Sequence, residues 1–155
     1  MNAELIDCNI SHAEQISNWA NDLDVRKNAF NSNPIEWADH VKWFEKKLAS
    51  QSTKLYILKK NEDLIGQIRF DLNEHHNWLI DYSIDKNFRG QGLGKLIIQL
   101  GIEKIKAYSH DIIAEVKVDN IASIQVFSAL GFRQIFKNND YVTFEFKINQ
   151  NESSI

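Results

Sequence analysis

The residues with the clearest chemical potential form a glycine-rich turn at positions 89–94, which reads RGQGLG. Glycine lets backbone amides approach a ligand closely because it carries no side chain. Apolar residues at helical spacing follow the turn from Leu93 to Tyr108, so a helix is predicted to begin there. Because a helix N-terminus carries partial positive charge, the turn predicts a binding site for a phosphate group.

Two common nucleotide-binding motifs do not match this turn. A P-loop needs glycine at the position of Arg89 and Ser or Thr at the position of Leu96, and the dinucleotide fingerprint needs glycine at Lys95. The glycines alone are equally compatible with a plain connection from strand to helix. The elements around the turn must therefore decide what it does.

Three strand-like segments precede the turn, and short polar turns between them predict an antiparallel meander. After the turn and its helix comes a β-rich run, and Asn120 then caps a helix that stops at Gly131. The predicted strands are 55–59, 64–71 and 78–84 before the turn and 112–118, 133–136 and 141–148 after it, with the capped helix over 121–130.

The N-terminal third begins with an alternating strand at about 4–8. Ser11 and Glu14 form a capping-box pattern, which predicts a helix through Trp19. With the later elements, this start predicts an α/β class with a mixed sheet, antiparallel first and locally parallel later.

Residues 22–34 are polar and rich in turn formers, so a loop is expected there. Pro34 suits the first turn of a second helix that reaches about Ser50. Trp43 lies off the apolar stripe of that helix and is predicted to face something other than the core. The stripe consists of Trp37, Val41, Phe44 and Leu48.

Composition predicts a single domain over 1–148, followed by a polar tail over 149–155. The chain has 155 residues, of which 43% are hydrophobic and 25% charged, as expected for one globular unit. The formal charge of −3 gives no global attraction to nucleic acid or to an anionic membrane. We expect a monomer or a homodimer.

Cysteine and histidine usage argues against a disulfide or a metal centre. Cys8 is the single cysteine, so no intrachain disulfide and no cysteine-based zinc site can form, and a reducing cytoplasm fits best. No export signal or membrane-spanning run is evident. His75 and His76 point to opposite sides in an extended chain and are expected in a hairpin turn without a metal.

Two segments resemble the GNAT acetyltransferase superfamily. The turn at 89–94 is similar to its R/Q-x-x-G-x-G/A signature, and residues 118–132 (VDNIASIQVFSALGF) resemble its Asn-capped helix ending in Gly-Phe. The resemblance covers about residues 3–148. It implies a mixed, mostly antiparallel seven-stranded sheet with helices on both faces and with the fourth and fifth strands splayed apart.

The resemblance also implies that acetyl-CoA is the co-substrate. Backbone amides of the turn would hold the pyrophosphate, Arg89 would add charge, and an amide near Ser83 or Ile84 would steady the thioester oxygen. Asn120 would hold the pantetheine or pyrophosphate side. The implied cofactor-binding residues are Ser83, Ile84, Arg89, Gly90, Gln91, Gly92, Leu93, Gly94, Lys95, Asn120, Ser123 and Phe127.

One position departs from the family. Where the family often has a tyrosine that protonates the departing thiolate, this chain has Phe127. Tyr82, Tyr141, Ser123 or a water molecule must replace it, or the thiolate leaves without an acid.

The acceptor amine needs a base, because an ammonium has no lone pair for attack. Asp81 is the first candidate, since strand alternation places it with Ser83 on the face opposite Ile80, Tyr82 and Ile84. Glu115 on the fifth strand is the second. The alternative for both residues is an acidic side chain exposed on the surface of a strand, with no catalytic role.

The acceptor is expected to be a nucleotide-linked 4-amino sugar. Stretches 25–28 (VRKN), 65–71 (IGQIRFD) and 80–85 (IDYSID) resemble acetyltransferases of the pseudaminic-acid pathway, which modify such sugars. Arginines would neutralise a diphosphate and a tryptophan would stack on a sugar or base. The candidate acceptor residues are Trp19, Arg26, His40, Trp43 and Arg69, with core packing as the alternative for Trp19.

Two other functions remain open from the sequence. The first is acetylation of a protein N-terminal or side-chain amine, which an acidic cleft would favour. The second is a non-catalytic acyl-CoA-binding module, which the replacement of the usual tyrosine by Phe127 would favour.

Overall fold

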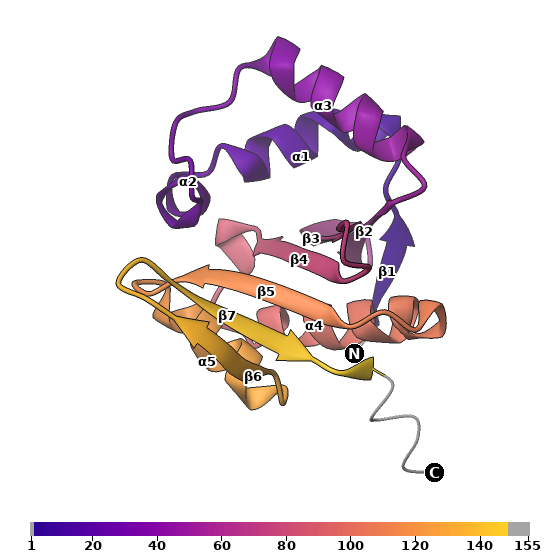
Figure 1. Cartoon of the computed structure of the whole chain (residues 1–155). Coiled ribbons are helices and arrows are strands. Elements are labelled where there is room, and N and C mark those ends of the chain that lie inside the picture. The colour runs from indigo at the N-terminus through magenta and orange to yellow at the C-terminus, as the bar shows by residue number, and fades with distance from the viewer. Residues whose placement is uncertain (1, 149–155) are drawn as a thin grey trace.

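Within residues 2–148, the part that the computed structural model describes, the chain forms seven strands and five α-helices (Figure 1). The strands are β1 (Ala3–Asp7), β2 (Thr53–Lys60), β3 (Asp63–Leu72), β4 (Trp78–Ile84), β5 (Ile112–Lys117), β6 (Arg133–Lys137) and β7 (Tyr141–Phe146). The helices are α1 (Ala13–Ala20), α2 (Leu23–Asn28), α3 (Trp37–Ala49), α4 (Leu93–Ile105) and α5 (Ile121–Ala129). The tail predicted over 149–155 lies outside the described residues.

All described strands belong to one sheet with the order β1-β2-β3-β4-β5-β7-β6. Every neighbouring pair is antiparallel except β4 and β5, which are parallel. The predicted meander and the mixed sheet are confirmed. Figure 1 shows α1, α2 and α3 on one face of the sheet and α4 and α5 on the other, as expected.

The parallel pair is short. Strands β4 and β5 are paired only at Trp78 with Ile112 and at Leu79 with Ile113. Beyond these two steps the strands separate, so residues 80–84 have no ladder with β5. The predicted splay between the fourth and fifth strands is confirmed, and it leaves an opening within the sheet.

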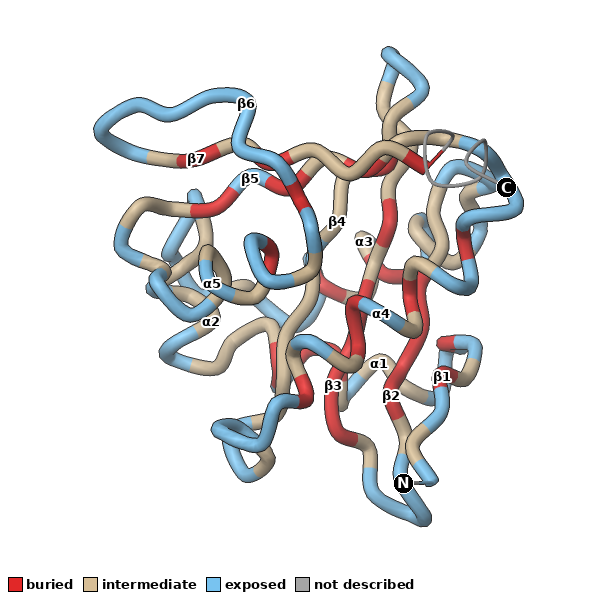
Figure 2. Tube along the Cα trace, turned by 90° about the horizontal axis from the view of Figure 1, so that it is seen from below, coloured by how far each residue is buried: buried red, intermediate tan, exposed pale blue. Residues whose placement is uncertain are grey.

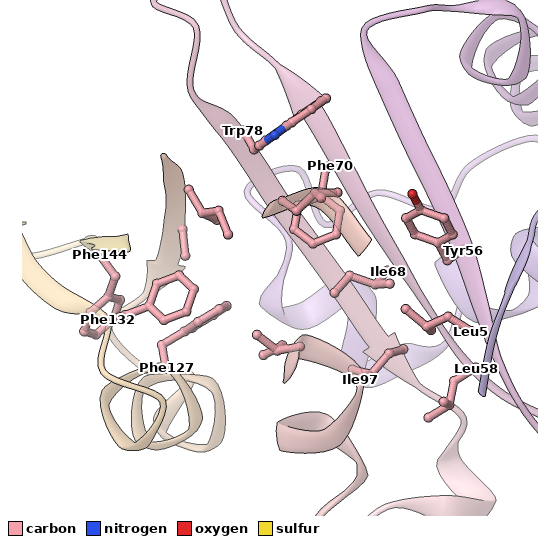
Figure 3. Packing of buried hydrophobic residues seen from close by; sticks show 14 of the residues in the cluster. Leu5, Tyr56, Leu58, Ile68, Phe70, Trp78, Ile97, Phe127, Phe132 and Phe144 are labelled. Atoms are coloured by element: carbon pink, nitrogen blue, oxygen red, sulfur yellow. The ribbon is translucent and has the colours of Figure 1, made fainter. Parts of the chain in front are cut away.

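Each face of the sheet has its own hydrophobic core. The larger core lies under α4 and α5, where Figure 3 shows Phe70, Ile97 and Phe127 among its packed side chains. The smaller core joins α1 and α3 to the other face and consists of Cys8, Ile16, Trp19, Phe44, Leu55 and Ile57. Buried stretches accordingly concentrate in β2, β3 and α4, as Figure 2 shows. Because side chains on both faces of the sheet are packed against helices, the two cores hold the strands that border the opening in place.

Helix starts in the N-terminal third differ from the prediction. Asn9, rather than Ser11, begins the first helical turn, because its side-chain oxygen accepts from the Ser11 amide at 3.0 Å while the His12 ring accepts from the Asn9 amide. The predicted loop at 22–34 contains α2, because the Asp22 carboxylate accepts from the amides of residues 24 and 25 and so caps a helix.

The start of α3 was also predicted too early. The helix begins at Trp37 with Glu36 as its N-cap, so Pro34 precedes it rather than forming its first turn. Trp37 was expected in the apolar stripe but is 52% exposed. It is the first residue of α3, and it is not among the buried residues of the smaller core. Phe44 of the same stripe is fully buried.

Gly66 on β3 sets how closely β4 can approach. A Cβ at this position would collide with the main-chain oxygen of Ser83 and would lie 3.3 Å from the Cα of Ile84. Both are backbone atoms of β4, which cannot move without shifting the strand that borders the opening.

We therefore expect Gly66→Ala to lower the free energy of unfolding by about 1–3 kcal/mol, the usual effect of overpacking. Urea denaturation measures it. Gly94→Ala is the matched control, because its Cβ would lie 3.4 Å from the Tyr82 ring at ordinary contact distance. Equal stability of both variants would contradict the proposed backbone collision.

Candidate active site

The opening between β4 and β5 is the centre of a cavity of about 1140 Å³. Its walls come from both faces of the sheet: α2, the following loop and α3 on one face, and the glycine turn with α4 and α5 on the other. A channel therefore reaches through the sheet where the strands part.

The glycine turn borders this cavity at the start of α4. Gly90 and Gly92 adopt left-handed backbone conformations with φ of 78° and 75°, which side-chain-bearing residues rarely take. A Cβ at either glycine would meet no atom within 4 Å, so the space beside the turn is open. Gly92 is the N-cap of α4. The turn thus offers helix N-terminal amides in an accessible cradle that fits a phosphate group.

Most of the residues predicted for the cofactor line this one cavity. The exception is Gln91, which borders a separate small cavity beside Lys60 and Asn61. Those that line the main cavity are Ser83, Ile84, Arg89, Gly90, Gly92, Leu93, Gly94, Lys95, Asn120, Ser123 and Phe127.

Arg89 is held by the N-terminal part of the chain. Its terminal nitrogens contact Asp22 at 2.9 Å and Asp24 at 3.0 Å, and its Nε donates to the Ile84 carbonyl at 3.0 Å. Burial acts to raise the pKa of Asp22, but the hydrogen bond and charge of Arg89 and the two amide donors outweigh burial and lower it. Sequence reasoning did not find these carboxylates. The guanidinium ties α2 to the glycine turn.

The N-terminal turn of α5 forms the opposite wall. Asn120 caps this helix as predicted, since its side-chain oxygen accepts from the Ser123 amide at 3.3 Å. The Ser123 hydroxyl lies 2.8 Å from the Tyr82 hydroxyl, and Phe127 packs edge-on against the Tyr82 ring with centroids 5.7 Å apart. A strand residue and a helix residue thus meet within the opening.

Burial raises the pKa of the Tyr82 phenol, the hydrogen bond between Tyr82 and Ser123 opposes this shift, and the charge of Asp81 adds to it. The phenol therefore keeps its proton throughout the neutral pH range. It can act as a hydrogen-bond donor in the cavity.

A polar cluster lies on the other face of β3 and β4. Asp81 Oδ2 accepts from Gln67 Nε2 at 3.0 Å and lies 3.7 Å from an Arg69 nitrogen. Arg69 also contacts Asp71 at 2.8 Å and lies over the Trp43 ring, 5.0 Å from its centroid. Gln67, which sequence reasoning did not single out, is placed by the same alternation that put Asp81 and Ser83 on one face.

Asp81 and Glu115 both line the cavity, on the two strands that part. The Asp81 side chain is 54% exposed, and Glu115 is exposed on β5. Asp81 thus faces away from the larger core, as strand alternation predicted, and Glu115 also lies outside that core. Within residues 2–148, Glu115 forms no ion pair and is accessible from the cavity.

The chain matches the model of the acetyltransferase (GNAT) family over residues 14–132. It belongs to the GNAT acetyltransferase family. A search of curated protein sequences found no significant match.

Solved structures share the GNAT fold over nearly the whole chain. The spermidine N-acetyltransferase of Vibrio cholerae, in complex with CoA and spermine, has a TM-score of 0.83 at 17% identity and covers 94% of this chain and 95% of that one. An N-acetyltransferase of Staphylococcus aureus Mu50 gives a TM-score of 0.81 at 18% identity, covering 96% and 99% of the two chains. RimL, a ribosomal L7/L12 α-N-protein acetyltransferase in complex with CoA, gives 0.81 at 16% identity, with 96% of each chain covered.

In this GNAT member, two residues predicted for the acceptor are in the core. Trp19 is 5% exposed, donates its indole N–H to Asp85 Oδ2 at 2.9 Å and is absent from the cavity wall, so it packs in the core, which was the alternative given for this residue. His40 borders the cavity but is 1% exposed, between the rings of Trp37 and Phe44. Burial lowers the pKa of His40. Both lie on helix faces that pack onto the sheet.

The other predicted acceptor residues line the cavity. Trp43 is there together with Arg69, as its off-stripe position predicted. Arg26 donates to the main-chain oxygens of Asn31 at 3.0 Å and Asn33 at 3.2 Å, so it braces the loop after α2. Side chains of this loop add amides to the wall.

Residues 2–148 contain no helix with the length and apolar character that crossing a membrane requires. In the same range, no three His, Cys, Asp or Glu side chains are grouped as metal ligands. His75 and His76 lie in the turn between β3 and β4, as predicted.

Proposed function

We propose that this GNAT enzyme transfers the acetyl group of acetyl-CoA to the primary amine of a nucleotide-linked 4-amino sugar. One observation carries the proposal: a single cavity joins the glycine turn on one face of the sheet to a wall of amide, aromatic and arginine side chains on the other. Two substrates can meet in it only where β4 and β5 separate.

The glycine turn and β4 suit acetyl-CoA. The open cradle at Gly90 and Gly92 fits a pyrophosphate, which would accept from the amides at the start of α4. Beyond Leu79 the edge of β4 has no ladder with β5, so its backbone groups are available to a pantetheine arm. Acetyl-CoA supplies the activated acetyl group. The CoA in the similar Vibrio cholerae structure supports the same choice.

Asp81 is the proposed base. Its Oδ2 is held by Gln67 and Arg69, whereas no described residue is bonded to Oδ1, which is free to take a proton from the acceptor ammonium. Glu115, across the opening, is the second candidate. Both carboxylates line the cavity on the face of the sheet opposite the larger core, so either one can contact an acceptor bound there.

The far wall suits an amino sugar linked to a diphosphate. Asn28, Asn31 and Asn33 bring amides that can bind hydroxyls, and the Trp43 ring offers a flat apolar surface. Arg26 and Arg69 supply positive charge beside them, partly balanced for Arg69 by Asp71 and Asp81.

A protein amine is the second candidate acceptor. Five carboxylates of the described residues line the cavity on this side. Asp24 is paired with Arg89, and the other four favour a cationic substrate, namely Glu36, Asp39, Asp81 and Glu115. RimL, whose fold is similar, is a ribosomal α-N-protein acetyltransferase.

Gly92→Ala is expected to weaken acetyl-CoA binding at least tenfold, because a Cβ strains the left-handed backbone and intrudes on the cradle. Calorimetric titration of acetyl-CoA measures the loss. Gly131→Ala is the matched control, since Gly131 also has positive φ (89°) and open space but does not line the cavity. If both variants bound acetyl-CoA as the parent does, the turn would not be the phosphate site.

Asp81→Asn is expected to lower kcat by about 10²–10⁴-fold, the usual contribution of a general base, with little change in acetyl-CoA affinity. Glu115→Gln, which neutralises the acid across the opening, should have the smaller effect. Steady-state rates for both variants with one acceptor measure this. The reverse order of effects would assign the base to Glu115.

Release of free thiol from acetyl-CoA tests the acceptor directly. We expect rapid release with a UDP-linked 4-amino-4,6-dideoxy sugar and slow release with basic or neutral N-terminal peptides. Release with peptides alone would establish the protein-amine alternative. Tight acetyl-CoA binding without release for either acceptor class would favour a non-catalytic module and contradict the proposal.

A further inference from the structure

We propose that the Tyr82 hydroxyl, positioned by Ser123, is the acid that protonates the departing thiolate. This inference rests on the proposed acetyl transfer and assigns a catalytic group that the helix position Phe127 does not supply.

Amide formation from a thioester expels a sulfur anion. A free thiol has a pKa of about 8.5 in water, and a desolvated cavity disfavours the anion further. A proton donor beside the sulfur therefore lowers the barrier.

Three hydroxyl side chains line the cavity, those of Tyr82, Ser83 and Ser123. The Ser83 hydroxyl lies on the other face of β4, where it accepts from Gln67 Nε2 at 3.2 Å. A serine hydroxyl is a much weaker acid than a phenol. Tyr82 is accordingly the strongest hydroxyl acid in this cavity.

The fold brings the Tyr82 hydroxyl between the first turns of two helices. Ser123 of α5 lies 2.8 Å from it, and a Cβ on Gly94 of α4 would lie 3.8 Å from the same oxygen. Both helix N-termini carry partial positive charge, which stabilises the phenolate left after proton donation. Phe127 packs edge-on against the ring and holds its orientation.

The strand position adds a second reason. Tyr82 follows Leu79, the last residue of β4 that pairs with β5, so its ring borders the opening rather than a neighbouring strand. The charge that acts on it comes from the adjacent Asp81, which together with burial raises the pKa of the phenol. Tyr82 thus holds a proton at neutral pH and has it available for the sulfur as negative charge develops there in the desolvated cavity.

The proton balance closes with residues of this chain and solvent. Asp81 takes one proton from the acceptor ammonium, and the neutral amine then attacks the thioester carbon. The nitrogen of the adduct loses its second proton to solvent as the amide forms. Tyr82 gives its proton to sulfur as the C–S bond breaks and sulfur receives the bonding electron pair. Ser123, hydrogen-bonded to Tyr82, relays a proton from solvent back to the phenolate.

The variant Tyr82→Phe keeps the ring and removes only the hydroxyl, and we expect it to lower kcat about 10²-fold or more with little change in the acetyl-CoA KM. Ser123→Ala should give a smaller loss, since the phenol remains. Tyr108→Phe is the control, because Tyr108 is 48% exposed and does not line the cavity.

A binding measurement tests the same contact without turnover. Calorimetry at pH 9 should show that the parent protein binds CoA roughly tenfold more tightly than desulfo-CoA, and that Tyr82→Phe abolishes this preference. Unchanged desulfo-CoA affinity shows that the variant is folded.

An unchanged kcat or an unchanged preference for CoA in Tyr82→Phe would overturn the inference. If the parent protein transferred acetyl to no amine but kept a Tyr82-dependent preference for CoA, the proposed function would fail and the contact of Tyr82 with sulfur would stand.

Discussion

The short parallel pairing of β4 with β5 is the constraint on which the rest of this structure depends. Two paired steps, at Trp78 and Leu79, hold the strands together at one end, and the separation that follows creates the cavity. Longer pairing would bond the backbone of residues 80–84 to β5 and close the channel. The opening is stable because the larger core packs side chains from strands on both sides of it, so the two halves of the sheet are held together without the missing ladder.

The two faces of the opening have different chemistry because alternation in β4 separates them. Tyr82 points toward α4 and α5, where the environment is apolar apart from Ser123 and the helix N-termini. Asp81 and Ser83 point the other way, into a cluster with Gln67 and Arg69. Adjacent residues of one strand thereby place the proposed base and the proposed acid on opposite sides of the opening.

The N-terminal helices are joined to the cofactor side by ion pairs rather than by the sheet alone. Arg89 begins the glycine turn and contacts Asp22 and Asp24 at the start of α2, and the same helix carries Arg26, which braces the loop on the far wall. Helix α2 therefore contacts both the glycine turn, through Arg89, and the loop at 31–33 on the far wall of the cavity, through Arg26. Because Arg89 is engaged by two carboxylates, the proposed phosphate site of the turn rests mainly on its backbone amides.

The sequence by itself determined the features that depend on local rules. Alternation set the faces of β3 and β4, glycine set the turn at 89–94, and Asn120 set the start of α5, because each acts through residues close in the chain. The resemblance of two such segments also identified the family. Local rules failed where two caps competed, at Ser11 and Asn9, and where Asp22 turned a polar stretch into a helix.

Only the tertiary structure decided which side chains meet. The Tyr82–Ser123 bond joins residues 41 positions apart and the Arg89–Asp22 bond joins residues 67 apart, separations at which no periodicity carries information. The same holds for Trp19 and Trp43, two tryptophans on helices that pack on the same face of the sheet. Packing buries Trp19 against Asp85 and leaves Trp43 on the cavity wall, because burial depends on the position of each helix over the opening rather than on residue type.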